Sequence, residues 1–200
     1  MAVGGGRDMR KLLNRTSGLL IIMCLALAAL VGGVHPRQGS GKASPPPAPE
    51  LPRGGYVLPA GAGEVIRRKG NTVTVKVDPR TGSPGMAMGT QALEPGVGIP
   101  VHMHEHEDEV LFVHDGRGVA VLGGQRKEVG RGDTVFIPHG VWHGVESSGE
   151  AVELLWVVTP PGLEDFFRET GAPAGAQPRA LTPAQLEDIG RKHGVRFKPR

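Results

Sequence analysis

Three histidines and one glutamate at fixed spacing constrain the fold of this chain more than any other feature. His102, His104 and Glu109 lie close together, and His143 follows later in the chain. Imidazole nitrogens and a carboxylate suit one divalent Fe, Mn, Ni, Cu or Zn ion. Because these side chains must meet at one point, the chain needs a closed or sandwiched β architecture in which a later strand brings His143 to the others.

The spacing of the ligands also predicts a break between two strands. Alternate residues of a strand share a face, so His102 and His104 point the same way. Glu109 lies an odd number of steps from His104 and would face the other way on a straight strand. The polar segment 105–108 therefore predicts a turn or bulge that restores the facing of Glu109 at the start of a new strand. His106 has the parity of a rival ligand, but its use would break the register with Glu109, and we expect a surface turn residue.

Short alternating apolar stretches separated by turn residues predict a chain of strands. The 32 glycines and 18 prolines agree with many strands joined by tight turns. The expected strands cover residues 72–77, 86–94, 99–104, 109–114, 118–122, 126–129, 134–137, 141–146 and 152–159. Two helices are expected at 163–170 and 183–192, the second with Thr182 as N-cap and Pro183 in its first turn. The pattern predicts an all-β domain with short C-terminal helices.

The glycines and prolines around the ligands complete two motifs of the cupin family, which this chain resembles. The first motif is filled by Gly96, His102, His104, Glu109 and Gly116. The second is filled by Gly132, Pro138, Gly140 and His143, with Ser147 where the family has asparagine. The resemblance implies a single jelly-roll β-barrel with a metal ion inside it, held by the three histidines and Glu109.

Further segments resemble the bacterial quercetin-dioxygenase-like cupins, namely residues 56–59, 106–113, 162–169 and 193–197. This implies a mononuclear metal-dependent dioxygenase that acts on a small hydroxylated or enolisable organic substrate. Glu109 would be a metal ligand and also the base that removes a substrate proton. Only 4% of the residues are aromatic, too few to sandwich a flat flavonoid, so quercetin itself is a poor candidate. The expected pocket walls are apolar residues on inward strand faces: Met86, Met88, Leu111, Val113, Phe136 and Trp156.

Two other classes of function remain open, because cupins host many chemistries. One is a metal-dependent isomerase, epimerase or decarboxylase acting on a polar acid or sugar. It predicts a buried arginine or lysine in the pocket, for which Arg117 and Lys127 are the nearest candidates. The other is a non-catalytic exported cupin, which would retain a metal or small molecule without turnover.

The N-terminal part of the chain predicts export. A basic segment at 7–15 precedes an uncharged apolar stretch at 19–34. A helix over this stretch would span about 24 Å, shorter than a bilayer core of roughly 30 Å. Residues 1–34 therefore predict a secretory signal peptide, with an uncleaved membrane anchor as the alternative, and a periplasmic or extracellular protein.

The remaining domain boundaries follow from composition. We expect a Pro/Gly-rich disordered linker at 35–54, the cupin β-barrel at 55–162 and a helical extension at 163–200. The single cysteine, Cys24, precedes all three, so the folded part has no disulfide.

Charge and motif content narrow the partners to small molecules. The net charge of +3 owes much to basic residues that precede the apolar stretch, so the folded domain is close to neutral. It carries no helix-turn-helix pattern, which argues against nucleic acid as a partner. Membrane contact is expected only through an uncleaved N-terminal segment, and a homodimer is expected from the resemblance.

Overall fold

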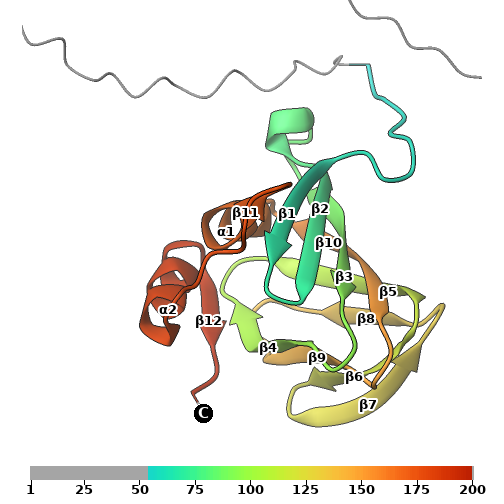
Figure 1. The fold of residues 1–200 in the computed structure, drawn as a ribbon, viewed down its shortest axis with the longest axis vertical. Coiled ribbons are helices and arrows are strands. Elements are labelled where there is room, and N and C mark those ends of the chain that lie inside the picture. The colour runs from blue at the N-terminus through green and yellow to red at the C-terminus, as the bar shows by residue number, and fades with distance from the viewer. Residues whose placement is uncertain (1–53, 200) are drawn as a thin grey trace, which may run out of the picture. The chain divides into compact units, whose positions relative to one another are not determined.

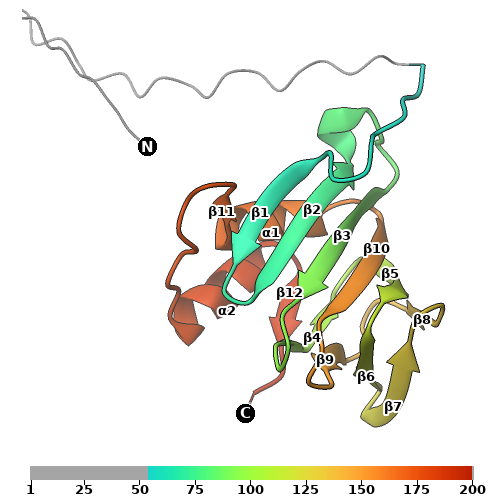
Figure 2. The same ribbon diagram turned by 45° about the vertical axis from the view of Figure 1, so that its right-hand side comes forward.

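Two antiparallel sheets form the domain, which the computed structural model describes from residue 54 to residue 199 (Figures 1 and 2). The larger sheet contains β1 (Glu64–Arg68), β2 (Asn71–Val77), β3 (Ala87–Leu93), β5 (Asp108–Asp115), β8 (Thr134–Ile137), β10 (Val152–Thr159) and β11 (Ala172–Pro173), in the order β11-β1-β2-β3-β10-β5-β8. The smaller sheet contains β4 (Gly98–His104), β6 (Arg117–Leu122), β7 (Gln125–Gly130), β9 (His143–Ser147) and β12 (Val195–Phe197), in the order β12-β4-β9-β6-β7. The predicted all-β jelly roll is confirmed, as two sheets rather than one closed barrel.

The core follows from side chains that alternate between the two faces of each strand. On β10, Val152, Leu154, Trp156 and Val158 are buried, each at 1% exposure or less. Neighbouring β3 has a glycine opposite Trp156, because a Cβ at Gly89 would lie 2.5 Å from the Trp156 ring. The largest core side chain thus occupies the space that this glycine leaves.

The helix α1 (Leu163–Thr170) packs at the end of the larger sheet that carries β1 and β11, whereas α2 (Pro183–Lys192) packs against α1 and against β12 of the smaller sheet (Figure 1). α1 buries Leu163, Phe166 and Phe167 in the hydrophobic core. α2 begins with a capping box between Thr182 and Gln185. Both helices have the predicted bounds, and a short 3-10 turn (Pro79–Thr81) follows β2.

The C-terminal extension differs from the helical unit that the sequence predicts. It also supplies β11, which pairs with β1, and β12, which pairs with β4. One strand of each sheet therefore comes from the last part of the chain. The expected strand at 141–146 also begins two residues late, at His143.

An arginine on α1 ties the helix to the larger sheet. The Arg168 side chain is 13% exposed and donates hydrogen bonds to Glu64 on β1, to Asp165 and to Asp78. The Asp78 side chain has no exposed surface, and its other oxygen accepts a hydrogen bond from the backbone N–H of Thr81. Arg168 therefore neutralises a buried carboxylate.

Replacing Arg168 with methionine should destabilise the fold by about 3 kcal/mol. Removing one member of a buried pair leaves the other charge uncompensated, which costs roughly 3–5 kcal/mol, and rehydration of the exposed Glu64 and Asp165 places the effect at the lower end. Urea unfolding of the full chain measures it. The matched control is Arg80→Met, because Arg80 pairs with Asp165 while 55% exposed, and such pairs contribute about 0–1 kcal/mol. Equal losses in the two variants would show that Arg168 is an ordinary surface residue.

The predictions for the N-terminal segment (1–34) and for nearly all of the linker (35–54) concern residues outside the described part of the chain. Within residues 54–199, the structure contains no helix with the length and apolar character needed to span a membrane.

Candidate metal centre

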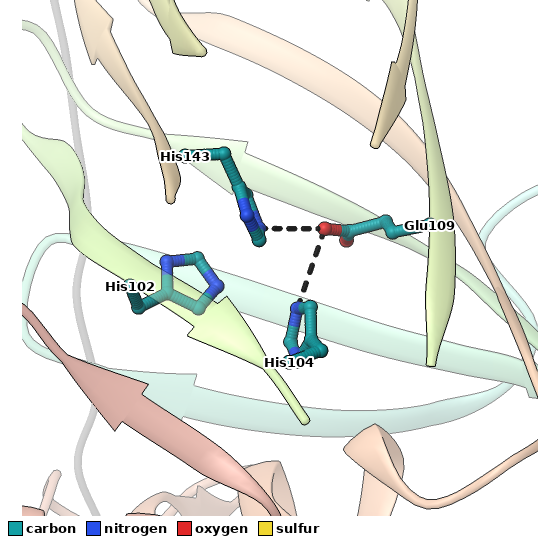
Figure 3. A group of neighbouring side chains, drawn as sticks. All are labelled: His102, His104, Glu109 and His143. Carbon is teal, nitrogen blue, oxygen red and sulfur yellow. Dashed lines mark ion pairs between the residues drawn. The ribbon is translucent and has the colours of Figure 1, made fainter. Parts of the chain in front are cut away.

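The four predicted ligands meet between the two sheets (Figure 3). His102 and His104 project from β4 and His143 from β9, whereas Glu109 comes from β5 of the larger sheet. Their ligand atoms all lie within 4.8 Å of one another, and no residue of the four is more than 8% exposed. The cluster is thus a buried group that can hold a metal ion.

Strand pairing explains the meeting point. His102 lies directly opposite His143 in the β4–β9 pair. The chain bends at residues 105 and 106 before β5 begins at Asp108. This bend turns Glu109 to face the histidines, which confirms the predicted break in parity. His106 is exposed on the bend, as expected of a turn residue.

Two of the imidazole rings are oriented by backbone carbonyl groups. His102 donates through Nδ1 to the Pro100 carbonyl at 2.8 Å, and His143 donates through Nδ1 to the Val141 carbonyl at 2.9 Å. A carbonyl only accepts, so the ring proton must lie on Nδ1. In the neutral ring, the Nε2 lone pair is then free for a metal, as in many metal sites.

The contacts inside the cluster fit an ion better than they fit direct pairing. His143 Nε2 lies 3.0 Å from Glu109 Oε2, and His104 Nε2 lies 3.4 Å from the same oxygen. Neither nitrogen has a hydrogen-bond partner within residues 54–199. When the His143 ring is neutral, its Nε2 lone pair faces a carboxylate oxygen, an arrangement that a cation between them would stabilise.

The protonation states agree with metal binding. Burial, helped by repulsion from His143 and His104, holds the pKa of His102 well below its usual value. Burial would raise the pKa of Glu109, but contacts with His104 and His143 outweigh it and hold that pKa well below its usual range. At neutral pH His102 is therefore neutral and Glu109 ionised, and these are the forms that bind a metal.

A small internal pocket opens onto the cluster. The space open to the centre of a water molecule is about 30 Å³. His102, Glu109 and His143 line it together with side chains from both sheets, from α1 and from β12. These include Arg68, Gln91, Ile99, Leu111, Leu163, Phe166, Phe167 and Phe197. The C-terminal extension therefore helps to enclose the site.

Only one of the six expected pocket residues, Leu111, lines this pocket. Val113 and Trp156 are buried in the core at 1% and 0% exposure. The remaining three residues were expected on inward strand faces, and this expectation is wrong. Phe136 is 58% exposed because Ile137, its neighbour on β8, is the residue that faces inward. Met86 and Met88 alternate with buried Ala87 and Gly89, so they lie on the other face of the strand.

The polar residues of the pocket were missed in the sequence. Arg117 and Lys127 are both exposed, whereas Arg68 on β1 and Gln91 on β3 line the pocket. The alternation of side chains along β1 and β3 could have indicated that these two polar residues face inward. Arg68 has the parity of buried Ile66, and Gln91 has the parity of Ala87 and Leu93.

Comparison with known proteins supports the motif-based resemblance. A family model described as the cupin domain matches residues 89–158, which include all four candidate ligands. The uncharacterized protein SCO3923 of Streptomyces coelicolor is 36% identical over 76 residues, which are 38% of this chain and 71% of that protein. The chain belongs to the cupin family.

A second relative matches over a shorter segment. The uncharacterized protein MJ1618 of Methanocaldococcus jannaschii is 32% identical over 62 residues, which are 30% of this chain and 50% of that protein. Among solved structures, an RmlC-like cupin from Shewanella frigidimarina aligns with a TM-score of 0.50 and 20% identity, over 56% of this chain and 96% of that one. At this identity the similarity supports the cupin fold alone.

Proposed function

We propose that this cupin is a mononuclear metal-dependent enzyme acting on a small hydroxylated or enolisable organic substrate, with dioxygenation as the leading reaction. The observation that carries the proposal is that the buried His₃Glu cluster forms part of the wall of an internal pocket. A structural metal site is closed by its ligands, whereas a catalytic site leaves positions free for substrate. Four protein ligands leave one or two positions on a five- or six-coordinate ion.

A bound divalent ion would polarise a substrate oxygen and, if redox-active, allow electron transfer to dioxygen. The remaining roles belong to the protein. The carbonyl groups of Pro100 and Val141 fix His102 and His143, so the site is organised before substrate arrives. Glu109 lines the pocket in its ionised form, which is the form that can accept a proton from the substrate. Leu111, Phe166 and Phe197 limit the access of water.

A non-oxidative isomerase, epimerase or decarboxylase is the second candidate. This class predicts a basic side chain inside the pocket, and Arg68 occupies such a position. The two candidates share the metal and the enolisable substrate, and they differ in whether dioxygen is consumed.

Oxygen uptake separates the candidates. The full chain is loaded separately with Fe(II), Mn(II), Ni(II), Cu(II) and Zn(II) and mixed with acetoacetate or 2,4-pentanedione, two enolisable compounds. Dioxygenation predicts stoichiometric oxygen consumption with at least one redox-active ion and none with zinc. Product formation without oxygen uptake would move the assignment to the non-oxidative class. Binding of a probe without turnover under any ion would leave a small-molecule-binding cupin.

A further inference from the structure

The pocket contains a positive charge that has no anionic partner. Arg68 forms no side-chain hydrogen bond or ion pair within residues 54–199, unlike Arg168, which contacts three carboxylates. Burial lowers the pKa of Arg68 to about 10, so its guanidinium remains charged at neutral pH. The Arg68 side chain is partly buried, and partial loss of hydration around a guanidinium with no anion beside it is unfavourable, so such charges are normally paired.

Two aromatic rings hold the guanidinium without neutralising it. The Arg68 Cζ atom lies 5.3 Å from the centre of the Phe166 ring and 5.8 Å from that of Phe167. Stacking on aromatic faces favours a cation and fixes its plane, but it offsets only part of the desolvation cost. The N–H donors of a guanidinium form a fork that matches the two oxygens of a carboxylate, as it also matches those of a phosphate.

A second polar side chain of the pocket is also unpaired. Gln91 is 4% exposed and forms no side-chain hydrogen bond within the described residues. Its amide can both donate and accept. Its amide atoms are not among the fully buried unpartnered atoms of residues 54–199, so they remain accessible from the pocket, where a ligand would supply a partner.

The charge balance of the pocket points to the same kind of ligand. Arg68 is the only arginine or lysine that lines the pocket, and Glu109 is the only aspartate or glutamate. A divalent ion in the cluster would add to the charge of Arg68, and Glu109 alone would oppose them. The loaded pocket is then net positive, and an anionic substrate would neutralise it.

We infer that Arg68, assisted by Gln91, binds the carboxylate of the substrate, so that the substrate is a small organic acid whose enolisable or hydroxyl group faces the metal centre. The part of this inference that places the enolisable or hydroxyl group at the metal centre rests on the proposed function. The small pocket volume agrees with a substrate of few atoms.

Binding to the zinc-loaded full chain tests the inference without oxygenation, since zinc is not redox-active. The two probes are acetoacetate and 2,4-pentanedione, which share a pair of carbonyl groups and differ by a carboxylate in place of a methyl group. Wild-type protein should bind acetoacetate at least about 10-fold more tightly. Arg68→Met should weaken acetoacetate binding by about 10- to 100-fold, the range of a lost charged hydrogen bond, and leave the binding of 2,4-pentanedione unchanged. Arg68→Lys should retain part of the preference.

The matched control is Arg67→Met. Arg67 precedes Arg68 on β1, has the same charge and is exposed on the other face of the strand. It should bind both probes as the wild-type protein does. Equal weakening in the Arg67 and Arg68 variants would show a general charge effect and overturn the inference, as would equal affinity of wild-type protein for the two probes or failure of acetoacetate to bind.

The melting temperature gives a second test, because a purely structural role of Arg68 would make Arg68→Met melt lower than the wild-type protein. Without ligand, Arg68→Met should melt no lower than wild-type protein, since it removes a partly buried charge that forms no ion pair within residues 54–199. A clear loss of melting temperature would mean that Arg68 serves the fold. If the carboxylate preference holds while no ion supports turnover, the enzyme proposal fails and the anion site remains.

Discussion

His143→Ala is expected to reduce bound metal from about one ion per chain to nearly none after dialysis. The substitution removes one of four ligands from a buried cluster whose ligand atoms lie within 4.8 Å of one another. Loss of a residue that only orients a ligand typically costs 10- to 100-fold in metal affinity, so loss of a ligand should cost at least about 100-fold. Mass spectrometry of the metal content of the full chain, after loading with zinc or manganese, measures the effect.

His106→Ala is the matched control for this experiment. His106 has the same sequence parity as His102 and His104, but it is exposed on the bend between β4 and β5. This variant should keep its metal. Metal loss in the His106 variant together with retention in the His143 variant would replace the proposed ligand set by a different one.

Trp156→Ala is expected to destabilise the domain by about 3–5 kcal/mol, the usual cost of truncating a large buried aromatic residue. The Trp156 side chain has 0% exposure, and its ring centre lies 5.6 Å from that of Phe167 on α1. It lies on β10, which pairs with β3 on one side and β5 on the other. The loss would therefore reach the sheet that carries Glu109 and the helix that encloses the pocket. Urea unfolding followed by circular dichroism gives the free energy of unfolding.

Phe136→Ala is the control for the truncation of Trp156. Phe136 was expected in the pocket but is 58% exposed on β8. Its truncation should change the free energy of unfolding by no more than about 0.5 kcal/mol. A loss at Phe136 as large as that at Trp156 would mean that the inward and outward faces of the larger sheet are assigned the wrong way round.

Much of the candidate site could be predicted from the sequence because its physical determinants are local. The parity of His102, His104 and Glu109 requires a break in the strand, and the bend at 105 and 106 supplies it. The helix at 183–192 has a clear start in Thr182 and Pro183, and its bounds are as predicted. Fixed spacing and helix capping are readable without tertiary structure.

The short strands β11 and β12 could not be predicted, because they are too short to show an alternating pattern. They form where tertiary structure brings them alongside β1 and β4. These pairings join residues far apart in the sequence, such as Arg67 with Ala172. The partner of β11, strand β1, was missed too, since its charged residues obscure the apolar alternation.

The pocket walls were the least predictable part of the site. Apolar character predicts that a strand residue faces inward. The apolar Phe136 nevertheless faces outward, and the polar Gln91 faces inward. Strand parity decides the facing, and it can be counted only from a correct strand register. Arg68 was missed because charged residues mostly face solvent, and its place in the pocket wall, with no ion pair within residues 54–199, is the basis for the inferred carboxylate site.

The most direct test of the account is a crystal structure of the manganese-loaded protein with anomalous diffraction data. We expect one strong anomalous peak within about 2.0–2.3 Å of His102 Nε2, His104 Nε2, His143 Nε2 and a Glu109 oxygen, distances usual for nitrogen and oxygen ligands of divalent ions. The peak should be absent from His143→Ala crystals. A fully loaded protein with no anomalous peak at these four residues, or with its only peak elsewhere, would contradict the assignment of the metal centre.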